Sequence, residues 1–218
     1  MRFTKSLLIA AVTLLAPFIS HASPVLVTSD PTLSIGGMTF NDFTCSITKG
    51  GFIATPSNCS QIKVGTITTP GTGIEFNSGF SAAFGSFDDA VLSYKVSSDT
   101  GISNIGLNFD GDFLGLAVSS VVETVFSGGT EVGQATVSCS PFGCNDSDTI
   151  SLNGSYNNLS VEKDIYVGAS YIGIATDSII DQTFDASAPE PSSFMLLGTA
   201  FLGVGGLIRR RAKATIKA

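Results

Sequence analysis

The sequence predicts an all-β domain, an antiparallel β-sandwich of jelly-roll-like form, between a leader and a short C-terminal membrane helix. Three observations support this prediction. Apolar and polar residues alternate in short runs such as 92–96 and 105–109, and a period of two is typical of half-buried strands. Gly, Asn, Asp, Ser and Pro separate these runs, as they do in turns. Continuous apolar stretches lie near the two ends of the chain, at 7–19 and 194–208.

The central segment keeps the alternating pattern to its end. Further runs occupy 121–126, 132–137, 165–169, 172–176 and 179–184. Together they predict about ten strands or more, enough for two packed layers. Turns are expected where Asp-Gly, Gly-Gly and Asn-Gly pairs occur, at 110–111, 127–129 and 153–154.

Charge separates the 218-residue chain into a strongly acidic centre and basic ends. All 18 acidic residues lie in 23–190 with only four lysines, so this segment has a net charge of −14. It repels phosphate backbones, which excludes nucleic acid as a partner. The only histidine, His21, lies in the predicted leader. The central domain is therefore expected to lack Ser-His-Asp and Cys-His catalysis and histidine-ligated metals.

Residues 1–22 have the three parts of a secretory signal peptide. Arg2 and Lys5 form a positive start, 7–15 an apolar core, and Ser20-His21-Ala22 a cleavage site of the small-x-small type. We therefore expect export through the Sec translocon and removal of the leader by signal peptidase after Ala22. The apolar stretch is short and Pro17 interrupts it, which disfavours a permanent N-terminal anchor.

The C-terminal segment, 188–218, combines a rigid tripeptide, an apolar run and a cluster of positive charge. The tripeptide is Pro189, Glu190 and Pro191, the apolar run is 194–208, and the cluster is Arg209, Arg210 and Arg211. As a helix, residues 191–208 would span about 27 Å, just enough for a hydrocarbon core of ~30 Å. The arginines favour the cytoplasmic side, so the domain at 23–187 is expected on the outer side of the membrane.

This order of features resembles the PEP-CTERM sorting signal of Gram-negative bacteria, with Pro189-Glu190-Pro191 as the motif. The resemblance implies that an exosortase, a membrane-embedded cysteine transpeptidase, recognises the signal and removes the tail. The inner-membrane helix is then a temporary tether, and the protein continues to the cell surface or to the exopolysaccharide and biofilm matrix. An ordinary single-span anchor remains the alternative. The central domain is similar to other PEP-CTERM ectodomains in general texture alone, so no functional residue is carried over.

All four cysteines lie in the exported part of the chain. In an oxidising compartment an even number predicts disulfides. Spacing favours the pairs Cys45–Cys59 and Cys139–Cys144, each of which closes a short loop. A four-thiolate zinc site is the alternative, but neither pair has the Cys-x2-Cys spacing of zinc knuckles.

Acidic loops are the candidate ligand sites. Asn108, Asp110 and Asp112 place three oxygen-bearing side chains at alternate positions around an expected turn, where they can begin a calcium site. They do not match an EF-hand, because Ser119 stands where a bidentate Glu is required. Two further candidates are the pairs Asp146 with Asp148 and Asp88 with Asp89. The competing interpretation is that all of these are solvated turn residues. No other cofactor is expected.

Paired carboxylates can also make a glycosidase, but a chain with this many acids contains accidental pairs. The chain has no Trp to stack on sugars, and its tyrosines are expected in the core or in cross-strand pairs: Tyr94, Tyr156, Tyr166 and Tyr171. We therefore expect no enzyme. The function that the sequence favours is a non-catalytic component of the extracellular matrix, and the alternative is a calcium-dependent carbohydrate-binding module.

Overall fold

The computed structural model describes residues 23–186, which form strands and two short 3-10 helices, so the predicted all-β class is confirmed. The first elements are β1 (Val25–Leu26), η1 (Val27–Ser29), β2 (Leu33–Ile35), β3 (Met38–Gly50), β4 (Ala54–Thr55), η2 (Cys59–Gln61) and β5 (Lys63–Ile67). The others are β6 (Gly73–Ala83), β7 (Phe87–Leu114), β8 (Ala117–Ser127), β9 (Thr130–Ser140), β10 (Gly143–Asn145), β11 (Ser147–Ala169) and β12 (Ile174–Ala186). No helix within this part of the chain is long and apolar enough to cross a membrane. The leader and the expected helix at 194–208 lie outside the described residues.

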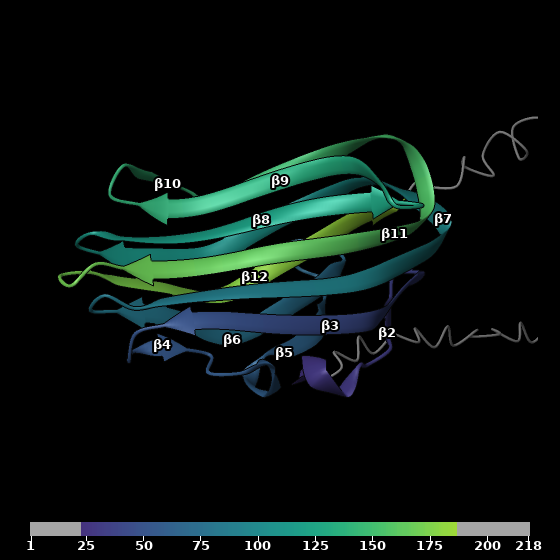
Figure 1. Ribbon diagram of the computed structural model, residues 1–218. Coiled ribbons are helices and arrows are strands. Elements are labelled where there is room, and N and C mark those ends of the chain that lie inside the picture. The colour runs from purple at the N-terminus through teal and green to yellow at the C-terminus, as the bar shows by residue number, and fades with distance from the viewer. Residues whose placement is uncertain (1–22, 187–218) are drawn as a thin grey trace, which may run out of the picture.

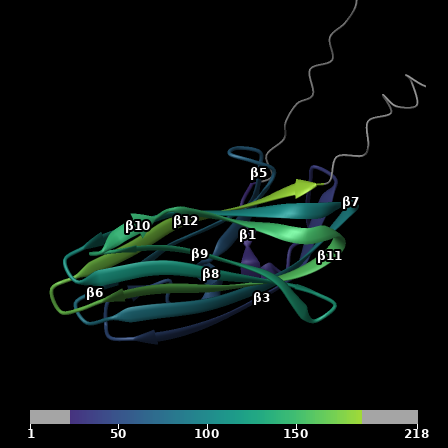
Figure 2. The ribbon, with the colours of Figure 1, turned by 90° about the horizontal axis from the view of Figure 1, so that it is seen from above.

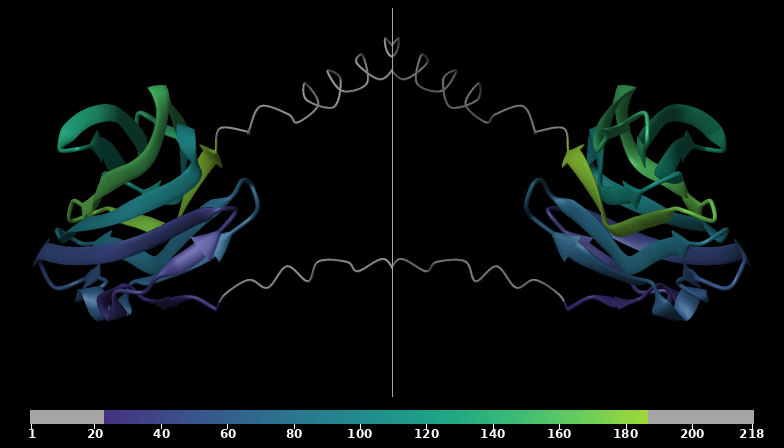
Figure 3. Two further views of the ribbon diagram at one scale, coloured as in Figure 1. Left: turned by 90° about the vertical axis from the view of Figure 1, so that its right-hand side faces the viewer. Right: turned by 90° about the vertical axis from the view of Figure 1, so that its left-hand side faces the viewer.

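One antiparallel sheet curls over to make both layers of the sandwich (Figures 1 and 3). The two longest strands, β7 and β11, belong to both layers. The first half of β7 pairs with β3 and with the second half of β11, which continues through β8 to β9 and β10. The second half of β7 pairs with β12 and the first half of β11, and β12 continues through β6 to β5 and β1. Viewed from above, the strands run side by side along the long axis (Figure 2).

The long strands change layers where their alternation of buried and exposed residues reverses. In β7 the even-numbered positions from Asp88 to Ser98 are buried, whereas Ile105, Leu107 and Phe109 are the buried positions beyond the bend. Gly101 occupies the bend with φ of +80°, and a Cβ there would collide with Ser155 of the neighbouring strand. Only glycine combines this backbone angle with that close approach. The reversal lets both halves of one strand face the same core.

The space between the layers is filled by apolar side chains with an aromatic centre. Tyr94 stacks on Phe43 with ring centroids 5.4 Å apart, and Phe40 and Phe76 pack against the same ring. Offset ring contacts of this kind add to the burial of apolar area. Tyr94 is therefore a core residue, as expected, whereas Tyr171 is 85% exposed in the loop between β11 and β12, contrary to expectation.

Two of the three predicted turns are wrong. Residues 127–129 do connect β8 to β9, but 110–111 lie inside β7 and 153–154 inside β11. Gly111 pairs with Asp177 of β12, and a Cβ on it would meet the Phe109 ring and Ser119. This Asp-Gly pair thus marks a close approach within the sheet, which its sequence does not distinguish from a hairpin turn. The run expected at 172–176 also begins later, with β12 at Ile174.

Both predicted disulfides are confirmed. Cys45 of β3 bonds to Cys59 of η2, and Cys139 of β9 bonds to Cys144 of β10. None of the cysteines in residues 23–186 is free. The first bond holds the irregular segment between β4 and β5 against the sandwich, and the second closes the loop that carries Phe142.

Candidate functional site

One end of the sandwich exposes large apolar side chains. Eleven such residues are exposed in the described chain, and nine of them lie at or between strand ends that the pairing register brings together. These nine are Phe52, Ile53, Phe84, Phe87, Leu114, Leu116, Phe142, Tyr171 and Ile172. We call this the loop end; it is at the left in Figure 1. Clusters of exposed apolar residues are uncommon on monomeric proteins and mark contact sites.

The loop end contains an open hollow of about 660 Å³. Its walls come from the turns before β7 and β8 and from the ends of β9 and β11. The side chains that define it are Phe87, Leu116, Pro141, Phe142 and Tyr166. Phe142, fully exposed on the disulfide-closed loop, stands at its side. The hollow is mostly apolar and is large enough to hold a small-molecule ligand or part of a longer one.

Two aromatic rings lie over glycines of the sheet beside this hollow. Phe87 and Tyr166 stack with ring centroids 6.4 Å apart and 22° between their planes. A Cβ on Gly50 would collide with the Phe87 ring, and one on Gly168 would collide with Tyr166. Glycine at both positions therefore lets the rings lie close against the strands. The resulting aromatic pair, Phe87 with Tyr166, was not predicted, because 79 residues separate them and only the β7–β11 register joins them.

Carboxyl groups follow the aromatic pair along the same outer face. Asp89 is the register partner of Tyr166, and Asp164 lies two residues before Tyr166 on β11. Burial, reinforced by the nearby charge of Asp89, raises the pKa of Asp164. A like charge beside a carboxyl group disfavours its ionised form, which is why the neighbour on β7 affects Asp164. The two acids offer hydrogen-bonding oxygens next to an aromatic surface.

The predicted calcium residues do not surround a turn. Asn108, Asp110 and Asp112 lie on β7, and side chains two apart on a strand share a face but sit about 6.6 Å from one another along it. Asp110 accepts a hydrogen bond from Ser178 at 3.1 Å, and Asp112 accepts one from the backbone N–H of Phe113 at 2.7 Å. An extended strand spreads three such positions over about 13 Å, so the three residues do not converge around a turn, and a calcium site here stays a prediction.

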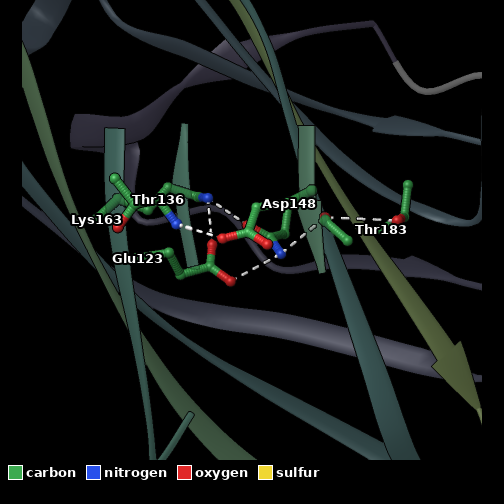
Figure 4. Close-up of polar contacts among 7 residues, drawn as sticks. Glu123, Thr136, Asp148, Lys163 and Thr183 are labelled. Carbon is green, nitrogen blue, oxygen red and sulfur yellow. Dashed lines mark hydrogen bonds and ion pairs between the residues drawn. The ribbon is translucent and has the colours of Figure 1, made fainter. Parts of the chain in front are cut away.

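The other acidic candidates are divided between different roles. Asp88 points into the sandwich and is fully buried, whereas Asp89 is on the outer face, so the pair makes no common site. Asp148 accepts the backbone N–H of Thr136 at 2.8 Å and links β11 to β9 (Figure 4). Within residues 23–186, acidic, His and Cys side chains gather closely enough for one ion at Cys139, Cys144 and Asp146, where both sulfurs are in the disulfide.

A second polar cluster lies inside the core and was not predicted. Lys163 of β11 and Glu123 of β8 are register partners whose side chains point inward and form a fully buried ion pair (Figure 4). Gln182 reaches them from β12 in the opposite layer, where its carbonyl oxygen contacts Lys163 Nζ and its Nε2 donates to Glu123 Oε1 at 3.0 Å. The sequence signal was present, since each residue occupies an inward position of an alternating run.

Two further buried groups are coupled electrostatically to this cluster. Tyr94 has a hydroxyl without a hydrogen-bond partner, and burial together with the charge of Glu123 raises its pKa far above the ordinary value. Asp177 is 1% exposed, also without a partner, and burial raises its pKa to about 7. The charge of Asp110 adds to that increase and Lys163 opposes it. Burial likewise lowers the pKa of Lys163, against the influence of Glu123.

Comparison with known families decides what the C-terminal segment is. Residues 187–211 match the family model of the PEP-CTERM protein-sorting motif. The chain carries a PEP-CTERM sorting signal. The signal identifies an exported protein that an exosortase sorts to the cell surface, as the sequence predicted. The PEP-CTERM motif itself lies outside the described residues, and no curated protein matches the chain.

Solved structures similar to the domain are distant. A carbohydrate-binding module, TmCBM61, in complex with β-1,4-galactotriose has 11% identity and a TM-score of 0.36, covering 66% of this chain and 89% of that one. The module CBM36 with calcium and xylotriose has 15% identity and a TM-score of 0.25, covering 64% and 99%. The enzymatically active domain of bacteriophage CBA120 tailspike protein 4 has 14% identity and a TM-score of 0.29, covering 70% and 20%. Likenesses at this level carry no inference about a ligand.

Proposed function

We propose that the protein is a non-catalytic component of the cell-surface exopolysaccharide or biofilm matrix and that it binds polysaccharide at its loop end. The aromatic pair beside the open hollow is the observation that carries this proposal. Aromatic rings present flat apolar surface to the C–H faces of sugars, and the neighbouring carboxyl groups of Asp89 and Asp164 can accept hydrogen bonds from sugar hydroxyls. Without tryptophan in the chain, Phe and Tyr fill the stacking role.

The position of the sorting signal supports a binding role for the loop end. Ala186, the last described residue, ends β12 and is paired with Ile102 at the bend of β7, opposite the loop end. The sorting signal follows from there at 187–211. A domain held through this segment therefore presents its apolar loops away from the attachment point. Export through the Sec translocon and leader removal after Ala22 belong to the same proposal.

The residues around the hollow favour binding over catalysis. The cysteines of residues 23–186 are all disulfide-bonded, so they supply no thiol nucleophile, and the chain's only histidine is His21. Asp89 and Asp164 are the carboxyl groups that adjoin the aromatic pair. They interact directly, whereas a glycosidase separates its two acids by about 5 Å or more to hold substrate between them.

The test is binding of the mature protein to exopolysaccharide from its own host and to an array of defined glycans. We expect Phe87→Ser and Phe142→Ser to weaken binding at least tenfold, because each removes an apolar wall of the hollow. Phe52→Ser is the matched control for Phe142→Ser, since Phe52 is a loop-end phenylalanine as exposed as Phe142 that does not line the hollow. Equal binding by all three variants and the unaltered protein would contradict the site.

Two additional conditions separate the alternatives. Repeating the binding measurement with a chelator tests the calcium-dependent alternative, for which binding is lost and returns with added calcium. Incubation with the bound polysaccharide tests catalysis through the release of reducing ends. Hydrolysis that Asp89→Asn abolishes would replace the non-catalytic proposal with a hydrolase.

A further inference from the structure

The buried cluster of Lys163, Glu123 and Gln182 holds three reactive kinds of side chain in mutual contact. All three side chains are fully buried, and each contacts the other two. Lys163 Nζ contacts Glu123 Oε2 and Gln182 Oε1, while Gln182 Nε2 donates to Glu123 Oε1 at 3.0 Å and to the Gly106 carbonyl at 3.1 Å. An amine, a carboxamide and a carboxyl group thus form a closed ring of contacts in an apolar core.

We propose that Lys163 and Gln182 form an intramolecular isopeptide bond, with Glu123 as the proton carrier. The electrophilic carbon Cδ of Gln182 is one bond beyond the oxygen that Nζ contacts. A nucleophile held this close to its target gains the advantage of an intramolecular reaction. The bond would join β11 in one layer to β12 in the other, a connection that neither disulfide makes.

The reaction balances with the groups that are present. Lys163 first transfers a proton to Glu123, which leaves a neutral amine and a neutral carboxyl group. Nζ attacks Cδ of Gln182. Glu123 gives the proton it has received to Nε2 of Gln182, and its carboxylate then accepts the proton that Nζ loses. The C–N bond to Nε2 breaks, ammonia leaves, and one amide has replaced another. No oxidant, reductant or added reactant is needed.

The surroundings favour both the reactive state and the product. Burial lowers the pKa of Lys163, which promotes the neutral amine that attack requires. The residues next along the strands are apolar and buried, namely Val121 and Val125 beside Glu123, and Val161 and Ile165 beside Lys163. A buried ion pair carries a large desolvation cost, and the amide product removes both charges. All three side chains are fully buried, which disfavours hydrolysis of the bond.

A cross-link at this place suits a domain attached through its C-terminus. β12 is the last strand before the sorting signal, and Gln182 lies four residues before its end. Any pull on the attached segment reaches β12 first. A covalent bond from β12 to β11 keeps the last strand in the sandwich. Without it, the hydrogen bonds of β12 would break one after another under load.

Mass spectrometry of the full chain tests the proposal at the level of peptides. The protein is denatured, reduced and digested with a protease that cleaves after lysine. We expect cleavage after Lys49, Lys63 and Lys95 and none after Lys163, whose amine is blocked. The fragment that begins at residue 96 should be lighter than its sequence by one ammonia, and fragment ions should link the residue 163 region to the residue 182 region. Complete cleavage after Lys163 with no mass deficit would overturn the proposal.

Three variants sharpen the result. Glu123→Gln keeps the size of the side chain but removes the proton carrier, so we expect cleavage after Lys163 to return. Gln182→Glu should lose water in place of ammonia and give a linked peptide identical in mass to the unaltered one. Lys95→Met, which breaks the exposed ion pair with Asp42 at 2.7 Å, is the control and should leave the link intact. A deficit of one water in the unaltered protein, with Lys163 joined to Glu123, would also contradict the proposed bond.

Discussion

The interior of the sandwich and its loop end depart in opposite ways from the usual distribution of residues, in which apolar side chains are buried and charged ones are exposed. Ionisable side chains lie in the core, among them Lys163, Glu123 and Asp177, each no more than 1% exposed. Large apolar side chains lie in solvent at the loop end, where Phe52 and Phe142 are fully exposed. The buried charges lower the stability of the fold unless something compensates for them, and the exposed apolar cluster favours contact with another surface. The comparison shows that Lys163 and Glu123 find their partners within the chain, whereas no segment among residues 23–186 covers the loop end.

Breaking the interior pair should have the largest effect on stability. Lys163→Met leaves Glu123 buried without its partner, and such a loss typically costs about 3–5 kcal/mol. Lys95→Met should cost no more than ~1 kcal/mol, because the exposed pair with Asp42 is screened by water. Chemical denaturation at neutral pH measures both. Equal effects of the two substitutions would mean that the buried pair contributes no more to stability than the exposed pair.

The double variant Lys163→Met with Glu123→Leu tests whether the loss of stability in Lys163→Met comes from the unpaired Glu123. It replaces both buried ionisable groups with apolar groups of similar size, so we expect it to recover the part of the lost stability that comes from leaving Glu123 without its partner. A double variant less stable than Lys163→Met alone would show that the core depends on the polar contacts of Gln182 more than on charge balance.

The buried carboxyl of Asp177 should make the fold less stable as pH rises. Its pKa of about 7 in the fold exceeds the ordinary 3.8, so the folded state binds the proton more tightly than the unfolded chain. Stability from this group is complete below the ordinary pKa and is lost as pH rises toward 7, by about 1.4 kcal/mol for each pH unit in that window. Asp88, with a pKa raised to about 6, acts in the same direction.

Denaturation at pH 5 and pH 8 measures this dependence. We expect a free energy of unfolding about 3 kcal/mol lower at pH 8, and Asp177→Asn should remove most of the difference. Asp42→Asn is the control, because that carboxyl group is exposed. An unaltered protein that is more stable at pH 8 than at pH 5 would contradict the buried, protonated state of Asp177.

The sequence predicted the strands and disulfides because those depend on local pattern. Alternation identified the strands around Tyr94 and Val121, and short spacing paired Cys139 with Cys144. Neither site could be predicted in this way. Phe87 meets Tyr166, and Glu123 meets Lys163 and Gln182, through strand register and the curl of the sheet, which join residues 19 to 79 positions apart. Local pattern also gave no means of telling the in-sheet Gly111 from a turn glycine.

Opening the loop-end disulfide should have a moderate effect on stability and a larger one on binding. Cys139→Ser with Cys144→Ser releases a loop of five residues, which the chain-entropy model values at about 2 kcal/mol. The loop carries Pro141 and Phe142, two walls of the hollow, so polysaccharide binding should fall by more than the change in stability explains. Opening Cys45–Cys59 is the matched comparison, with a larger cost of about 3 kcal/mol for its 14-residue separation and no change in binding.

Substitution of the exposed loop-end residues should have the smallest effect on stability. Phe142 is fully exposed in the folded state, so Phe142→Ser loses no buried apolar area and should change the free energy of unfolding by no more than ~0.5 kcal/mol. If the loop end is a contact surface, the same substitution weakens polysaccharide binding and lowers self-association at high concentration. Light scattering and denaturation of one preparation measure both properties. A marked loss of stability would instead show that Phe142 is buried in solution, by its own chain or by a second copy, and the loop end would then be an interface and not a free binding site.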